Sequence, residues 1–190
     1  LLANASHELR SPLTRIRMGM ELMGSQPGPA FREEISRNIA ELDQLIDEIL
    51  LASRLDAREA DMGTVETIDL LGLAVEESAR AGAGLELAEG VESLLVPGVA
   101  KLLRRLVRNL LENARRYGKS PDTDTAQVEV TAKARENWVV MRIRDHGQGV
   151  PPEHLARLTQ PFFRGDSART AAAGAGLGLS IVDKTVQRMG

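Results

Sequence analysis

Two heptad stripes separated by a chain breaker occupy the first third of the sequence. Apolar residues recur at spacings of 4, 3, 4 and 3 within Leu9–Met23, and again within Ile35–Ile49. This spacing places apolar side chains along one seam of a helix. Ser25–Pro29, between the stripes, holds two prolines and a glycine, which interrupt helices. The pattern predicts a helical hairpin with helices over residues 1–24 and 31–56.

The apolar seams of this hairpin are too long for one hairpin to cover by itself. Two hairpins that pack into an antiparallel four-helix bundle bury both seams, and closed symmetric pairs are the commonest oligomers. The sequence therefore predicts a homodimer held together by a helical domain over residues 1–58.

Shorter elements of mixed type replace the heptad stripes over residues 59–190. Alternating apolar residues predict an antiparallel strand pair over 127–134 and 138–145. Mixed strands and helices are typical of a two-layer α/β sandwich, so the fold class expected for the whole chain is α+β. Further strands are expected at 63–68, 85–87 and 91–96, helices at 70–79, 99–117 and 177–189, and a loop at 121–125.

Composition excludes several classes of protein. The 190 residues carry a formal net charge of −3, which argues against non-specific nucleic-acid binding. No cysteine is present, so disulfide and thiolate chemistry are excluded, and three scattered histidines do not predict a zinc site. No stretch approaches the roughly 20 apolar residues of a membrane span, so contact with a membrane is expected only through segments absent from this chain.

His7 is the first candidate for chemistry. Extending the heptad stripe backward places it just off the apolar seam, on the solvent side of the first helix. An exposed imidazole is partly unprotonated near neutral pH and can act as a nucleophile. Glu8 can accept a proton from one ring nitrogen, although an ordinary solvated charge is an equally good interpretation. Ser11 shares the face of His7, and Pro12 is expected to bend the helix beside it.

A second group of candidates fits a nucleotide. Asn109, Asn113 and Arg116 share one face of the expected long helix. Two amides and a cation can hold hydrated Mg²⁺ and phosphate oxygens, although this stripe alone is more typical of a solvated face. Asp145, followed by two glycines, can accept a hydrogen bond from an adenine amino group. The glycine-rich segment 174–179 opens the last helix, which suits phosphate binding.

Neither of the common nucleotide-binding fingerprints describes these glycines. They do not follow a strand within a short βαβ unit, and no acidic residue lies about 20 residues further on, which disfavours a dinucleotide site. The Walker-A pattern is absent from the sequence.

The motifs together resemble those of sensor histidine kinases. The segment 6–13, Ser-His-Glu-Leu-Arg-Ser-Pro-Leu, resembles their phosphoacceptor box. The segments 109–117, 145–149, 158–164 and 174–179 resemble, in this order, the N box, the first glycine box, the F box and the second glycine box. These four belong to an ATPase domain that is shared with gyrase and the Hsp90 chaperones.

The resemblance implies an ATP-dependent protein-histidine kinase with ATP and Mg²⁺ as cofactors. It would phosphorylate His7, with Glu8 as acid/base partner, and pass the phosphoryl group to an aspartate in the receiver domain of a response regulator. Ser11 stands where relatives usually carry Thr or Asn, a position associated with dephosphorylating that partner. The resemblance also implies that the chain is the cytoplasmic portion of an inner-membrane sensor.

The resemblance also implies a set of nucleotide-binding residues. Asn109 would be the Mg²⁺ ligand, with Asn113 and Arg116 near the phosphates. Tyr117 would lie against the adenine, and Asp145 would recognise the base. The other implied pocket residues are Gly147, Gly149, Phe163, Arg164, Gly174, Gly176, Leu177, Gly178 and Leu179.

Two other functions stay open from the sequence. An ATPase of the same superfamily that drives a conformational cycle carries a glutamate in place of Asn109, because an amide cannot take a proton from water. A non-catalytic signalling scaffold would not need the intact ATP motifs. Two weaker expectations concern single features. Trp138 is expected to lie in the core. Most of a basic cluster on the long helix is expected to be solvated, and its members are Lys101, Arg104, Arg105 and Arg108.

Overall fold

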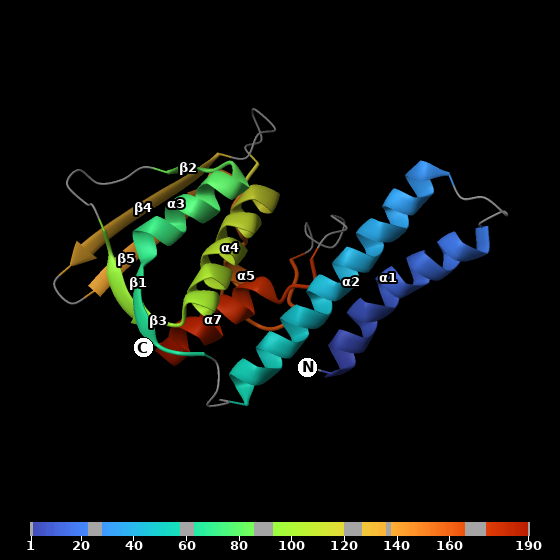
Figure 1. The fold of residues 1–190 in the computed structure, drawn as a ribbon, viewed down its shortest axis with the longest axis horizontal. Helices are drawn as coiled ribbons and strands as arrows, with labels where there is room; N and C mark the ends of the chain where they lie inside the picture. The colour runs from blue at the N-terminus through green and yellow to red at the C-terminus, as the bar shows by residue number, and fades with distance from the viewer. Residues whose placement is uncertain are drawn as a thin grey trace.

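The chain folds into a helical hairpin followed by a second unit in which helices cover one face of a sheet (Figure 1). The computed structural model describes residues 2–22, 28–57, 63–85, 93–119, 127–135, 138–165 and 174–189. The elements in chain order are α1 (Leu2–Leu22), α2 (Pro29–Asp56), β1 (Glu66–Asp69), α3 (Leu70–Ala81), β2 (Gly84–Leu85), β3 (Leu95–Gly98), α4 (Ala100–Tyr117), β4 (Val128–Arg135), β5 (Trp138–Asp145), α5 (Pro152–Leu155) and α7 (Gly178–Met189).

Helices α1 and α2 run side by side as the predicted hairpin (Figure 1). Pro29 opens α2, where the amide hydrogen that proline lacks would have no partner inside the helix. Helix α1 continues through Pro12, so the expected bend there stays a prediction. Much of the apolar seam remains open: Leu13, Met20, Ile39 and Ile46 are exposed.

Within its described residues, the second unit contains two small sheets. Strands β2, β4 and β5 form one sheet in this order, with β2 and β4 parallel and β4 and β5 antiparallel. Strands β1 and β3 pair antiparallel, with Glu66 opposite Gly98 and Asp69 opposite Leu95. Strand β3 starts later than expected from the sequence, because Ser93 and Leu94 lie outside it. The loop predicted at 121–125 lies outside the described residues.

The main core lies between the helices and the inner face of the β2-β4-β5 sheet. Val128, Val130 and Ala132 alternate along β4 and are buried against α3 and α4. Trp138 instead lies 68% exposed on the outer face, so the prediction of a core tryptophan is wrong. The reason is the period of two along a strand, which turns Val139 and Met141 toward the core and Trp138 away from it.

The basic cluster of α4 is mostly paired, contrary to the expectation of a solvated face. Arg104 and Arg108 each donate to the Glu77 carboxylate of α3 at 2.9 Å. The Glu77 side chain is only 1% exposed, and the hydrogen bond from Arg108 is the main cause that holds its pKa below its usual value. Lys101 alone of the cluster is exposed.

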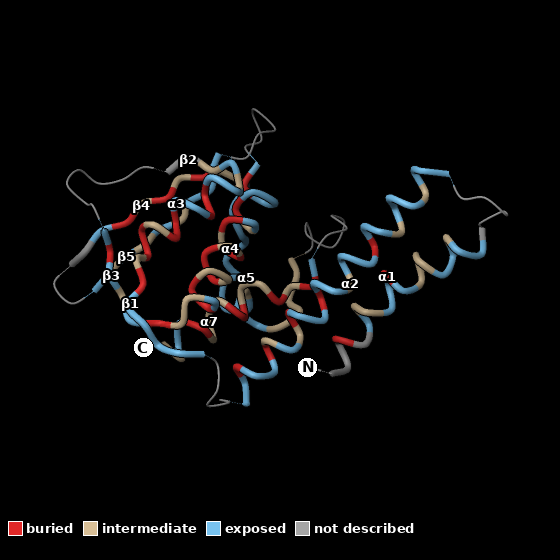
Figure 2. The backbone as a smooth tube through the Cα atoms, viewed as in Figure 1, coloured by how far each residue is buried: buried red, intermediate tan, exposed pale blue. Residues whose placement is uncertain are grey.

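The second unit packs against the hairpin through α2 (Figure 2). An apolar cluster joins the two units, and its buried members are Leu45, Ala52 and Leu55 of α2 with Ala175, Leu177 and Ile181. Two ion pairs flank this cluster: Arg105 of α4 with Glu48 at 2.7 Å, and Lys184 of α7 with Asp56 at 2.6 Å.

Candidate functional site

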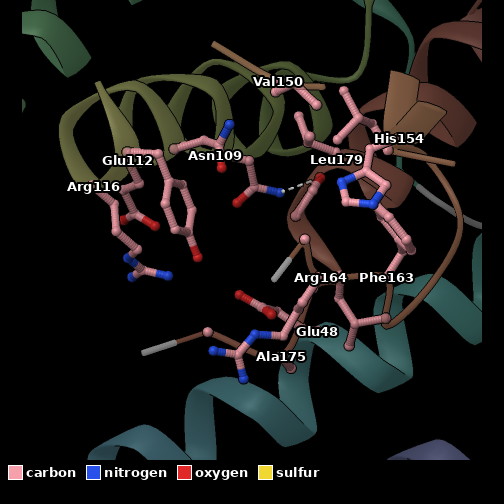
Figure 3. Close-up of a pocket in the computed structure, with 18 of the residues that line it drawn as sticks. Glu48, Asn109, Glu112, Arg116, Val150, His154, Phe163, Arg164, Ala175 and Leu179 are labelled. Carbon is pink, nitrogen blue, oxygen red and sulfur yellow. Dashed lines mark hydrogen bonds between the residues drawn. The ribbon is translucent and has the colours of Figure 1, made fainter. Parts of the chain in front are cut away.

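A cleft of about 1370 Å³ lies between the hairpin and the second unit (Figure 3). Its walls come from α1, α2, α4, the segment after β5 and the start of α7. Ordinary small-molecule pockets measure roughly 300–1000 Å³, and this cleft is larger because both units contribute walls. All the nucleotide-site residues implied by the resemblance line it, except Gly147. Their individual roles remain predictions.

Asn109 connects two of the motifs that are far apart in the sequence. It is 5% exposed on α4, and its Nδ2 donates to the carbonyl oxygen of Gly178 at 3.2 Å (Figure 3). This hydrogen bond ties the long helix to the first turn of α7. Because the amide nitrogen is engaged there, the side-chain oxygen is the atom suited to a cation.

Arg116 lies next to the second glycine segment. A Cβ atom at Gly174 would overlap the Nη1 atom of Arg116, and Gly174 has a φ of +100°. The φ is what favours glycine, because other residues rarely adopt it, whereas the guanidinium lies at the far end of a flexible side chain and can shift. The structure therefore places a cation against the backbone that leads into the helix N-terminus of α7, an arrangement that suits phosphate groups.

Asp145 stands at the end of β5 beside the end of α4. Its Oδ1 accepts a hydrogen bond from the backbone N–H of Gly147 at 3.0 Å, which fixes the carboxylate. Gly147 packs behind the cleft, where a Cβ atom would come within 2.5 Å of the Tyr117 carbonyl oxygen. Sequence reasoning missed Gly118, whose absent side chain lets Asp145 approach α4; a glycine directly after a helix end was the available signal.

A backbone hydrogen bond joins the F-box segment, residues 158–164, to the second glycine segment, residues 174–179. The N–H of Phe162 donates to the carbonyl oxygen of Gly176 at 3.0 Å. The ring of Phe163 meets His154 edge-on at 5.4 Å, and the Arg157 guanidinium lies 4.4 Å from its centre. His154 lines the cleft, and no signal in the sequence singled it out.

Leu177 and Leu179 flank the start of α7 with different surroundings. Leu177 is fully buried and packs with α2, so it joins the cleft to the hairpin. Leu179 is half-buried and lines the cleft. The Ser180 hydroxyl donates to the Leu177 carbonyl oxygen at 2.8 Å and fixes this turn.

The hairpin contributes the opposite wall of the cleft. Glu8 and Ser11 of α1 line it, whereas His7 is exposed just beyond the lining residues. Glu48 of α2 also lines it, and burial raises the pKa of this carboxyl group, opposed by the hydrogen bond from Gln44. No signal in the sequence marked Glu48, because an acidic residue on a helix is usually a solvated charge.

The cleft combines a cation, side-chain amides and a helix N-terminus, which together suit a phosphorylated ligand. Within the described residues, no group of three or more His, Cys, Asp or Glu side chains could hold a metal ion. Hydrated Mg²⁺ does not require such a group, because it keeps several waters and shares the oxygens of a nucleotide.

Two family models match the chain. Residues 1–58 match the His Kinase A (phospho-acceptor) domain, and residues 98–190 match the histidine kinase-, DNA gyrase B- and HSP90-like ATPase. The chain belongs to the sensor histidine kinase family.

Two curated relatives are sensor proteins of the same kind. Sensor protein QseC of Escherichia coli K12 is 35% identical over 99% of this chain and 42% of its own length. The kinase/phosphatase MprB of Mycolicibacterium smegmatis is 32% identical over 100% of this chain and 40% of its own length.

The chain thus spans about two fifths of the length of these relatives.

Solved structures of histidine kinases share its fold. AdeS of Acinetobacter baumannii matches with a TM-score of 0.69 at 18% identity, over 96% of this chain and 86% of that one. Full-length ShkA in complex with AMPPNP matches with a TM-score of 0.62 at 26% identity, over 99% of this chain and 40% of that one. The predicted family and the α+β fold class are confirmed. None of the helices in the described ranges is long and apolar enough to cross a membrane.

Proposed function

We propose that this chain is the catalytic core of a sensor histidine kinase, which uses ATP to phosphorylate His7 and passes the phosphoryl group to an aspartate of a response regulator. One observation carries the proposal. The turn of α1 next to His7, represented by Glu8 and Ser11, lines the same cleft as Asn109 and Arg116. A nucleotide bound in that cleft has its phosphates beside α1, the helix that carries His7.

The residues of the second unit bind and orient ATP in this proposal. The Asp145 carboxylate accepts a hydrogen bond from the adenine amino group, while the Gly147 N–H holds it in place. Arg116 and the N-terminus of α7 stabilise the phosphate charges. Asn109 offers its side-chain oxygen to Mg²⁺, and that ion neutralises phosphate charge when bound.

The residues of the hairpin carry out the chemical step. A ring nitrogen of His7 forms a bond to the γ-phosphorus as the bond from phosphorus to the ADP oxygen breaks. Glu8, the next residue along α1, accepts the proton from the other ring nitrogen. The phosphoryl group then moves to the aspartate of the receiver domain, which leaves His7 free for another cycle.

The exposed seam of the hairpin supports a homodimer. Leu13 is 51% exposed and Ile39 is 45% exposed, although both belong to long apolar stripes. A second copy of the hairpin would cover these side chains in a four-helix bundle. Residues 1–58 are the proposed dimerisation domain and residues 59–190 the proposed ATP-binding domain. A location as the cytoplasmic portion of an inner-membrane sensor is part of the same proposal.

Radiolabelled ATP tests the assignment of His7. With Mg²⁺, the wild-type chain should take up an acid-labile phosphoryl label, because phosphohistidine hydrolyses in acid. His7→Gln should abolish the label and still bind ATP, since His7 lies outside the residues that line the cleft. Autoradiography measures the label and calorimetry the binding.

The half-buried His146, which lies outside the residues that line the cleft, provides a matched control. It lies at the end of β5, pairs with Glu129 at 2.8 Å and is far along the chain from α1. His146→Gln should keep the acid-labile label. Equal labelling of wild type and His7→Gln would contradict the proposed function.

A further inference from the structure

Arg15 uses all three nitrogens of its guanidinium group on the surface beside His7. Its Nε donates to Asn38 Oδ1 at 2.7 Å, its Nη2 to Glu41 Oε2 at 2.6 Å, and its Nη1 to Ser11 Oγ at 3.2 Å. Ser11 and Arg15 follow His7 by one and two helical turns, so all three share one face of α1.

The partners on α2 hold this guanidinium in one orientation. Asn38 is 7% exposed, and its own Nδ2 donates to the Glu34 carbonyl oxygen at 2.8 Å, so its oxygen is fixed for Arg15. An isolated pair of exposed charges contributes little, and the Arg15 and Glu41 side chains are 39% and 46% exposed. A planar guanidinium that is held at three points is better defined than a single pair.

This arrangement determines how the Ser11 hydroxyl is presented. A serine hydroxyl has two acceptor lone pairs and one O–H donor, and the N–H of Arg15 occupies one lone pair. Serine lacks the second Cβ substituent that restrains the rotamers of threonine. The hydrogen bond from Arg15 therefore supplies an orientation that the serine side chain does not impose by itself.

We propose that Arg15 is a positioning residue for dephosphorylation of the response regulator by this chain. The inference rests on the proposed function, because it concerns the same partner docked on the same face of α1. With Arg15 on one lone pair, the second lone pair of Ser11 Oγ accepts a hydrogen bond from a water molecule and holds it against the aspartyl phosphate. The water oxygen bonds to phosphorus, the bond from phosphorus to the aspartate oxygen breaks, and inorganic phosphate and a proton leave.

Arg15 also lines the cleft, but the proposed formation of phosphohistidine uses His7 and Glu8. Within the described part of the chain, the hydrogen bonds of Arg15 reach Ser11, Asn38 and Glu41 and do not include His7 or Glu8. Loss of Arg15 should therefore lower the rate of dephosphorylation relative to the rate of labelling. A side chain that only braced the hairpin would lower both rates together.

The test compares two variants that break the same ion pair. Arg15→Gln removes the donor to Ser11, whereas Glu41→Gln removes the ion pair and keeps that donor. The substrate is a receiver domain that accepts label from His7 of the wild type and is then phosphorylated separately with phosphoramidate. The ratio of phosphate release to His7 labelling should fall about tenfold or more in Arg15→Gln and stay near wild type in Glu41→Gln.

Arg17→Gln is the matched control, because the Arg17 side chain is 75% exposed and pairs with Glu21 of the same helix. Arg15→Lys should recover part of the ratio, since lysine donates to Ser11 without the planar fork. An equal fall in Arg15→Gln and Glu41→Gln, or an unchanged ratio in Arg15→Gln, overturns the role of Arg15 and leaves the kinase assignment intact. Absence of transfer from wild-type His7 to any receiver domain overturns the proposed function and this role with it.

Discussion

Single residues at the end of the cleft beside β5 are fixed by backbone contacts. Asp145 accepts from the Gly147 N–H, and Gly118 leaves room for it at the end of α4. A carboxylate held in this way is already oriented before a ligand arrives, which lowers the entropic cost of binding. The side-chain oxygens of Asp145 are therefore suited to recognising a hydrogen-bond donor such as the adenine amino group.

Asp145→Asn should weaken ATP binding tenfold or more, since a hydrogen bond to a charged group contributes about 1.5–3 kcal/mol. Asparagine can still accept from Gly147, but its NH₂ group then faces the adenine amino group, another donor. Calorimetric titration with a non-hydrolysable ATP analogue measures the effect. Asp183→Asn on α7, where Asp183 accepts a hydrogen bond from Gln187 at 2.8 Å, is the control and should bind as wild type. Unchanged affinity in Asp145→Asn would remove Asp145 from the base site.

At the level of elements, the start of α3 is tied to the strand pair beside it. Asp69 is the N-cap residue of α3, and its Oδ1 accepts from the backbone N–H groups of Leu71 and Leu94, both at 3.0 Å. The hydrogen bond from Leu94 is the main cause that lowers the pKa of Asp69. One side chain thus caps a helix and anchors the segment that leads into β3.

Asp69→Ala should lower the free energy of unfolding by about 1–2 kcal/mol at neutral pH, because it removes the cap. Because the pKa is lowered in the folded chain, this contribution is present above the ordinary value of 3.8 and is lost as the pH falls through the folded value. Urea unfolding of both proteins between neutral and acid pH measures the difference. Asp43→Ala, at an exposed position of α2, should change stability by much less. A difference between wild type and Asp69→Ala that persists at the lowest pH would contradict the cap.

At the level of the whole molecule, a buried carboxyl group lies where the two units meet. The pKa of Glu48 is raised, and burial is the largest cause. Gln44, Arg105 and Arg116 oppose this increase, and Glu112 adds to it. A proton on Glu48 therefore favours the docked arrangement over one in which Glu48 is solvated. Docking should be strongest at or below the ordinary pKa of 4.5 and weaken as the pH rises through the raised value.

The distance between the units should report this pH dependence. The chain has no native cysteine, so Ser36→Cys on α2 and Gln127→Cys before β4 can carry a pair of fluorescent labels. Energy transfer should fall as the pH rises above 4.5, and Glu48→Gln should flatten the curve because a neutral amide does not titrate. Asp56→Asn is the control: it breaks the second ion pair and leaves the slope in place. A wild-type curve that matches Glu48→Gln would show that Glu48 does not control docking.

The hairpin, the order of most elements and the family could all be predicted from the sequence. These features are local: a heptad stripe defines a helix face, and motifs such as residues 6–13 are contiguous. The sequence also marked Asn109 and Asp145 as site residues, and the structure brings both to one cleft.

Contacts between groups that lie far apart in the chain could not be predicted and are seen only in the folded protein. It paired Arg105 with Glu48, 57 residues apart, and turned Trp138 outward on β5. It also joined Arg15 to Ser11, Asn38 and Glu41 on two helices. The physical reason is that the period of a helix or strand specifies a face, whereas the partner of a charged or apolar side chain depends on how the elements pack.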